Sequence, residues 1–127
     1  MREIKFRVWE KPGIVLSGSD GTAEFQGKMH TQDDWSFWGY ALSRLEEYEL
    51  MQWTYLVDRN GKDIFEGDII RFPDDQNTRR IYWADEFAGW CQRGQHSDAF
   101  YPDHASECEI IGNIYQNPEL LIEKQTN

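Results

Sequence analysis

The sequence predicts a mainly β protein folded as a small barrel or sandwich, and two observations support this. From residue 51 onward, short runs typical of strands recur at spacings of about 8–12 residues, with turn-forming residues between them. The chain has 127 residues and contains six Trp, six Tyr and seven Phe. These aromatic side chains supply a packed core, so we expect a folded chain of ordinary single-domain size.

The N-terminal segment, residues 3–9, alternates between apolar and charged side chains. Ile4, Phe6 and Val8 are separated by charged residues, a period of two that predicts a strand with one buried face. The Lys-Pro-Gly at residues 11–13 ends this strand. Two short strands are candidates in the ambiguous stretch that follows: residues 14–16 and residues 23–25.

Residues 33–50 predict an amphipathic helix. Asp33 or Asp34 can cap its N-terminus by accepting a hydrogen bond from a free backbone N–H. The large apolar side chains that follow are spaced three or four residues apart and fall on one helical face: Trp35, Trp38, Leu42 and Leu45. We interpret the two Trp as core residues rather than as a platform for a ligand.

The central region predicts a β-hairpin. Residues 51–57 are rich in aromatic and β-branched types, and the turn at Asp58–Gly61 is the clearest in the chain because its Asn-Gly pair tolerates positive φ. A second strand follows over residues 64–72. It is interrupted at Glu66–Asp68, where a glycine between two strand-like pieces indicates a bulge or a sharp bend.

The C-terminal half continues this pattern with short elements. We predict a hairpin of residues 80–84 and 87–92 that turns at Asp85-Glu86, a long polar loop over residues 93–106, a strand over residues 109–115 that is interrupted at Gly112-Asn113, and a short helical turn after Asn117. The helical turn is predicted because Asn-Pro-Glu is a favourable order of cap, first-turn proline and acidic residue.

Three segments resemble the YopX family, which is found largely in phages and prophages of bacteria. The most specific is residues 50–72, LMQWTYLVDRNGKDIFEGDIIRF; residues 4–9, IKFRVW, and residues 110–121, IIGNIYQNPELL, agree in order. The resemblance implies a small SH3-type β-barrel over residues 50–123. It implies that residues 1–49, with an N-terminal strand and helix, decorate this barrel within one compact domain. It brings no catalytic residue and no cofactor.

Tyr55 is the one clear departure from the family pattern, because the family usually has Gly at this position. Gly would suggest a bend before the hairpin turn, whereas Tyr favours an ordinary negative φ. We therefore expect the local backbone of this chain to differ.

Seven residues of these segments form the structural motif that we single out: Asp58, Gly61, Glu66, Gly67, Asp68, Gly112 and Asn113. Glu66 and Asp68 could act as paired carboxylates that bind a metal or transfer protons, because residues two apart in a strand face the same side. In the alternative, Gly67 has positive φ and Asp68 accepts backbone N–H groups in a turn. We favour the turn, because no third acidic residue has matching spacing.

Cys91, His96, His104 and Cys108 are residue types that bind zinc, and they lie within one 18-residue stretch. Their spacing matches no standard zinc motif, and there is no Cys-x-x-Cys pair. We therefore expect no metal site and two reduced thiols. The N-terminus lacks the apolar stretch of a signal peptide and no apolar run is long enough to span a membrane, which favours the cytoplasm and no membrane partner.

The net charge of −10 makes binding to nucleic acid unlikely, because the chain repels a phosphate backbone. A local exception is a basic patch of Lys62, Arg71, Arg79 and Arg80 near Trp83, since Arg interleaved with aromatics is typical of single-stranded nucleic acid binding. These charges are more typical of a solvated strand edge.

From these observations we expect a non-catalytic phage or prophage accessory protein that acts through protein contacts. Self-association through aromatic surface is the expected partner interaction, and a host or phage protein is the other. A factor that associates with nucleic acid, or an acidic DNA mimic, is the alternative function. A hydrolase or metal enzyme is the least favoured class.

Overall fold

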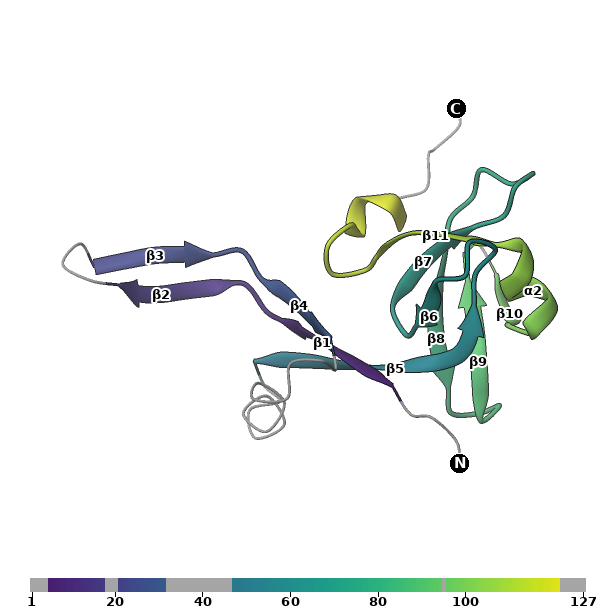
Figure 1. Ribbon diagram of the computed structural model, residues 1–127, viewed down its shortest axis with the longest axis horizontal. Coiled ribbons are helices and arrows are strands. Elements are labelled where there is room, and N and C mark those ends of the chain that lie inside the picture. The colour runs from purple at the N-terminus through teal and green to yellow at the C-terminus, as the bar shows by residue number, and fades with distance from the viewer. Residues whose placement is uncertain (1–4, 18–20, 32–46, 95, 122–127) are drawn as a thin grey trace. The chain divides into compact units, whose positions relative to one another are not determined.

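The computed structural model describes residues 5–17, 21–31, 47–94 and 96–121, and within them it is mainly β (Figure 1). All strand pairs in this part of the chain are antiparallel. The predicted mainly β class is therefore confirmed. The chain divides into two compact units, Met1–Gln52 and Trp53–Asn127, close to the boundary expected after residue 49. That they form one domain stays a prediction.

In the first unit, β1 (Phe6–Glu10) pairs on one side with β4 (Lys28–Thr31) and on the other with the first half of β5 (Tyr48–Val57). This confirms the strand predicted over residues 3–9 from Phe6 onward, while residues 3 and 4 lie outside the described part of the chain. Val8 and Tyr48 are buried together, with Phe6 packed against them. The apolar face of β1 is thus covered by the first residue of β5.

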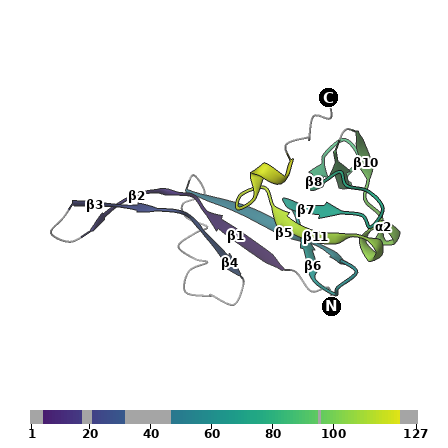
Figure 2. The same ribbon diagram turned by 90° about the horizontal axis from the view of Figure 1, so that it is seen from above.

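A two-stranded hairpin completes the description of the first unit. β2 (Gly13–Ser17) and β3 (Gly21–Phe25) pair from Gly13↔Phe25 to Ser17↔Gly21 and run side by side along their length (Figure 2). The two short strands that were candidates in the sequence are therefore both present.

The predicted helix over residues 33–50 is wrong at its C-terminal end. Tyr48 and Leu50 belong to β5, where they pair with Glu10 and Val8 of β1. The register with β1 decides their conformation, because strand pairing overrides a helical spacing of apolar residues. Residues 32–46, which carry the rest of this prediction, lie outside the described part of the chain.

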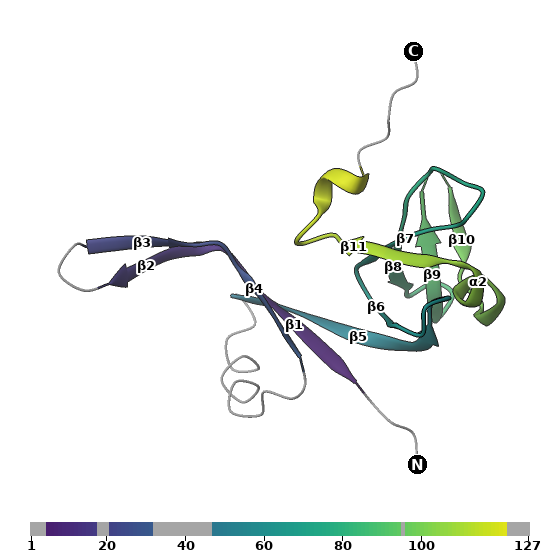
Figure 3. The ribbon, with the colours of Figure 1, turned by 45° about the horizontal axis from the view of Figure 1, so that its top comes forward.

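The second unit contains a five-stranded sheet in the order β10-β9-β8-β7-β11. The strands of this sheet are β7 (Asp68–Arg71), β8 (Arg79–Ala84), β9 (Gly89–Arg93), β10 (Ser97–Ala99) and β11 (Glu109–Asn113). The unit also contains the short strand β6 (Asp63–Phe65), the helix α2 (Pro102–Glu107) and the 3-10 helix η2 (Pro118–Leu121). Figure 3 shows β11 beside β7, with α2 leading into β11. The second half of β5 pairs with β6, so the predicted central hairpin is present over Asp63–Phe65. The rest of its predicted second strand is wrong, because β7 pairs with β8 and β11 instead of β5.

The long loop predicted over residues 93–106 is wrong, because this stretch forms β10 and α2. Ser97–Ala99 pairs with β9 although all three residues are exposed, so no apolar pattern marks this strand. α2 begins at Pro102, after Tyr101, whose backbone N–H donates to Nδ1 of His104 at 3.0 Å. Proline fits the first turn of a helix, since its missing N–H has no helical partner there.

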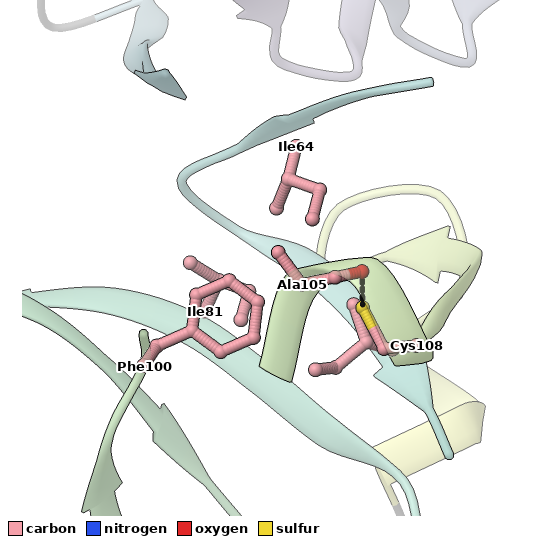
Figure 4. Packing of buried hydrophobic residues seen from close by; sticks show 6 residues of the cluster. Ile64, Ile81, Phe100, Ala105 and Cys108 are labelled. Atoms are coloured by element: carbon pink, nitrogen blue, oxygen red, sulfur yellow. Dashed lines mark hydrogen bonds between the residues drawn. The ribbon is translucent and has the colours of Figure 1, made fainter. Parts of the chain in front are cut away.

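The core of the second unit brings strands and helix together. Its buried residues are Ile64, Ile70, Ile81, Phe100, Ala105 and Cys108. Figure 4 shows Ala105 of α2 beside Cys108, whose Sγ donates to the carbonyl of Ala105 at 3.4 Å. Apolar burial therefore fixes α2 to the sheet, and the Cys108 thiol closes the last turn of the helix. Among the described residues, no helix is long and apolar enough to cross a membrane.

Candidate functional site

Asp58 organises the turn between β5 and β6. One carboxylate oxygen, Oδ1, accepts the backbone N–H groups of Asn60 and Lys62, both at 2.9 Å. The other, Oδ2, accepts the N–H of Ile110 in β11 at 3.0 Å. Gly61 has φ +80°, as predicted for this turn. Asp58 is only 3% exposed, so a single buried carboxylate joins the turn to β11.

The pKa of Asp58 reflects these contacts. Burial on its own raises the pKa, but the hydrogen bonds from Ile110, Lys62 and Asn60 and the positive charge of Lys62 lower it, and the net effect is a pKa below the ordinary 3.8. The carboxylate is therefore held in its ionised form as an acceptor.

The segment Glu66–Asp68 forms the tight turn between β6 and β7. Gly67 has φ +88°, and Oδ2 of the buried Asp68 accepts the N–H of Phe65 at 2.8 Å. The N–H of Gly67 donates to the carbonyl of Ile81 at 2.8 Å, and its carbonyl accepts the N–H of Ile114 at 2.9 Å. These bonds match the turn interpretation of this motif.

Gly112 and Asn113 lie where the pairing of β11 with β7 shifts register. Oδ1 of Asn113 accepts the N–H groups of Tyr115 and Gln116, at 3.1 and 2.9 Å. A Cβ on Gly112 would stand 2.5 Å from Oδ1 of Asn117, so no larger residue fits without movement. The two residues thus shape the bend that follows β11.

The expectation for Tyr55 is wrong, because this residue has φ +71°. Its ring stacks on Trp53, with centroids 4.8 Å apart. The pairing of β5 with β6 shifts register beyond Trp53, and the hydroxyl of Thr54 donates to the carbonyl of Ile64 at 2.7 Å within this irregular region. The surrounding contacts therefore hold the left-handed conformation that glycine would adopt freely.

The two cysteines are buried and unbridged. Burial, and secondly the negative charge of Asp58, raises the pKa of Cys108 to about 12, so its thiol is protonated. His104 stacks on Phe100 with ring centroids 6.2 Å apart, and its Nδ1 is an acceptor in the cap of α2. Within the described ranges, no three His, Cys, Asp or Glu residues are grouped so that they could hold a metal ion.

Two of the four residues of the predicted basic patch, Arg71 and Arg79, lie next to carboxylates. Arg79 pairs with Asp75 at 3.2 Å, donates to Gln92 at 3.0 Å and lies over the Phe72 ring at 5.0 Å. Arg71 lies 3.9 Å from Glu109, which also contacts Arg59 at 3.4 Å. These two arginines and Glu109 help to line a pocket of about 230 Å³. The ion pairs therefore engage two arginines of the patch, together with Arg59 outside it.

A feature that the sequence did not reveal is the exposed aromatic surface at the end of the β8–β9 hairpin. We use "hairpin tip" for Trp83, Asp85, Glu86, Phe87 and Trp90. Phe87 is 73% exposed and Trp83 44% exposed. Trp83 and Trp90 pair across the strands and meet edge to face, with centroids 5.2 Å apart. The predicted hairpin is present, but Phe87, expected in its second strand, lies in the turn.

The same turn holds a second unfavourable feature. Ala88 has φ +47°, a conformation that glycine or asparagine usually provides. Ala88 donates its N–H to the carbonyl of Asp85 at 3.2 Å and Phe87 donates to that of Ala84 at 3.2 Å, which closes the turn. The sequence predicts a turn at Asp85-Glu86, but it has no glycine or asparagine here that would mark the left-handed conformation of Ala88.

Comparisons with known proteins give a consistent picture. A family model described as "YopX protein" matches residues 5–122. The solved structure of protein EF1440 from Enterococcus faecalis is 24% identical, with 94% of this chain and 98% of that chain covered and a TM-score of 0.54. The structure of protein yopX from Bacillus subtilis is 16% identical, with coverages of 94% and 96% and a TM-score of 0.49. No curated protein matches the chain.

Proposed function

This chain belongs to the YopX protein family, and on that basis we propose that it is a phage- or prophage-derived accessory protein that acts without catalysis, as a protein-interaction module. We place the contact surface at the hairpin tip and the site of action in the bacterial cytoplasm. For the fold, we propose that the strands of the second unit form an SH3-type barrel. This barrel type assigns no activity, because a fold by itself does not determine function.

The exposure of Phe87 is the observation that carries this proposal. Burying a Phe side chain contributes about 1.5–3 kcal/mol, and at 73% exposure most of this gain is absent. The left-handed Ala88 beside it costs about 1–2 kcal/mol. A partner that covers this surface would bury the Phe87 ring and so offset both costs. Exposed apolar patches mark interaction sites, and backbone strain is concentrated at functional sites.

The polar motif supports a non-catalytic role. Asp58, Asp68 and Asn113 are all buried, and their oxygens accept backbone N–H groups of neighbouring turns. A group that holds the backbone in this way cannot give up its hydrogen bonds to a substrate without loosening the turn. Their chemistry is explained by the fold.

Site-specific photocrosslinking tests the proposal. The photoreactive amino acid p-benzoylphenylalanine replaces Phe87 in the full chain, expressed in bacterial cells, and Asn77 serves as a control position because it is exposed on a different loop. We expect protein adducts from position 87 and few from position 77. Equal adducts at both positions, or none from position 87, would contradict the proposal.

The same photocrosslinking experiment also tests self-association. An adduct with twice the mass of the chain would show a second copy at the hairpin tip, and any other mass would show a different protein. Sedimentation of the purified chain at several concentrations provides an independent measurement of the oligomeric state.

A further inference from the structure

The hairpin tip combines aromatic surface with uncompensated negative charge. Asp85 and Glu86 immediately precede Phe87 and are exposed. Neither carboxylate forms an ion pair with any residue in the described ranges. The only exposed large apolar side chains on this hairpin, within the described part of the chain, are Trp83 and Phe87. A partner that covers these rings therefore comes close to two free carboxylates.

The arginines of the same hairpin do not offset these carboxylates. Arg80 and Arg93 face each other across β8 and β9, three residues before Trp83 and three after Trp90. Because side chains alternate along a strand, an odd separation places them on the opposite face. Arg80 also lies over the ring of its neighbour Tyr82 at 5.7 Å. The two arginines therefore lie on the strand face opposite to Trp83 and Trp90, and they leave the charges of Asp85 and Glu86 uncompensated.

A second copy of this chain is poorly suited to this surface. In a two-fold contact each tip meets the same tip of the other copy, so four carboxylates would gather around the rings. Like charges across an interface oppose association. The sequence from residue 53 onward holds 14 acidic and seven basic residues, so the wider surroundings add to this repulsion.

We propose that the hairpin tip binds a cationic segment of another protein, one that carries Arg or Lys among apolar residues. This inference rests on the proposed interaction function and names its partner class. A guanidinium or ammonium group placed on the exposed Trp83 ring is attracted by the negative face of the ring. Asp85 and Glu86 attract the same cations, while apolar side chains of the partner cover Phe87. Arg fits better than Lys, since its planar group stacks on aromatic rings.

Peptide probes of defined charge test the inference on the purified full chain. Three fluorescein-labelled peptides have equal length and share their Leu and Ser positions, while the remaining positions are all Arg, all Gln or all Glu. Fluorescence anisotropy measures binding at low and at high salt. We expect the Arg peptide to bind at least about tenfold more tightly than the Gln peptide, with the difference shrinking as salt screens the charges.

Matched variants distinguish binding at the hairpin tip from attraction of the peptide by the net negative charge of the chain. The double variant Asp85→Asn/Glu86→Gln removes two charges at the tip, and Asp74→Asn/Glu119→Gln removes two exposed charges elsewhere in the second unit. We expect the first to weaken the Arg peptide about fivefold or more and the second by less than about twofold. Phe87→Ser is expected to weaken binding as well.

Each other outcome overturns the inference. Equal losses in the two double variants would show binding to the net charge alone, and equal affinity for the Arg and Gln peptides would show an apolar surface without charge selection. Absence of binding by the Arg peptide would also contradict it. In all three cases photocrosslinking at position 87 still decides the proposed function separately, and an adduct with a second copy there would replace the cationic partner by the chain itself.

Discussion

The carboxylate of Asp58 allows a direct test of how side chains stabilise the turns of this chain, because its two oxygens accept from different segments. Oδ1 accepts within the turn, and Oδ2 accepts from β11. Asp58→Asn keeps an oxygen for the N–H groups of Asn60 and Lys62 but places an NH₂ group opposite the N–H of Ile110. Two donors then face each other in a buried site, which costs about 1–3 kcal/mol. Asp58→Ala removes all three bonds, and we expect it to lower the free energy of unfolding by about 2–4 kcal/mol. The loss stays within this range because the amides of Asn60 and Lys62 lie near solvent and can bind water instead.

Urea unfolding of each variant, followed by fluorescence, measures these losses as changes in midpoint at constant slope. Hydrogen exchange of the Ile110 amide gives a local measurement, and Asp58→Asn should increase its rate. Asp74→Asn is the control, because an exposed carboxylate changes stability by less than about 0.5 kcal/mol. An unchanged Ile110 amide together with an unchanged midpoint would refute this role for Asp58.

The dependence on pH has a definite sign. The pKa of Asp58 lies below its ordinary value of 3.8, so its carboxylate stabilises the folded chain fully at pH values above that ordinary value. This stabilisation is lost as the pH falls through the lowered pKa of the folded state. The difference in stability between the natural chain and Asp58→Asn should therefore be constant near neutral pH and shrink in acid.

Four further predictions follow from the structure and the sequence. Gly61→Val should lower the free energy of unfolding by about 1–3 kcal/mol through backbone strain alone, since no atom lies within 4 Å of its added Cβ; unchanged thermal stability would contradict this. Asp68→Ala should cost about 1–2 kcal/mol, because the backbone N–H of Phe65 loses its acceptor; full stability with loss of a biological effect would instead mark a functional site. Strong chelators should leave the unfolding midpoint unchanged, and elemental analysis that finds about one zinc per chain would overturn the expectation of no metal. Duplex DNA should bind weakly or not at all at physiological salt in an anisotropy titration, and submicromolar affinity that falls steeply with salt would favour the nucleic-acid alternative.

The parts of the fold that were predicted correctly are those that local chemistry specifies. The Asp58–Gly61 turn contains residues that favour positive φ and side-chain capping, and the strand over residues 3–9 has a clear alternation of apolar and charged side chains. Both signals lie within a few residues of the structure they determine. The register between β1 and β5 and the bond from Ile110 to Asp58 join residues that are 38 to 52 positions apart, and they leave no such local pattern.

The errors have the same origin. Tyr48 and Leu50 fall within the bounds of the predicted helix, but β1 supplies strand partners for both. Tyr55 has no intrinsic preference for φ +71°, yet its stacking on Trp53 and the irregular pairing around it fix that conformation. In each case a tertiary contact outweighs the preference of the single residue, which is of the order of 1 kcal/mol.

The buried polar motif and the hairpin tip differ in how much they contribute to the stability of the fold. Asp58, Asp68 and Asn113 are buried, and each accepts backbone N–H groups of a turn, so substitutions there change stability first and any activity as a consequence. Phe87 is exposed and contributes little to the packing of the chain on its own. A loss of binding at an exposed position with unchanged stability can be attributed to the surface itself. The hairpin tip is therefore the place in this chain where an interaction function can be separated from folding.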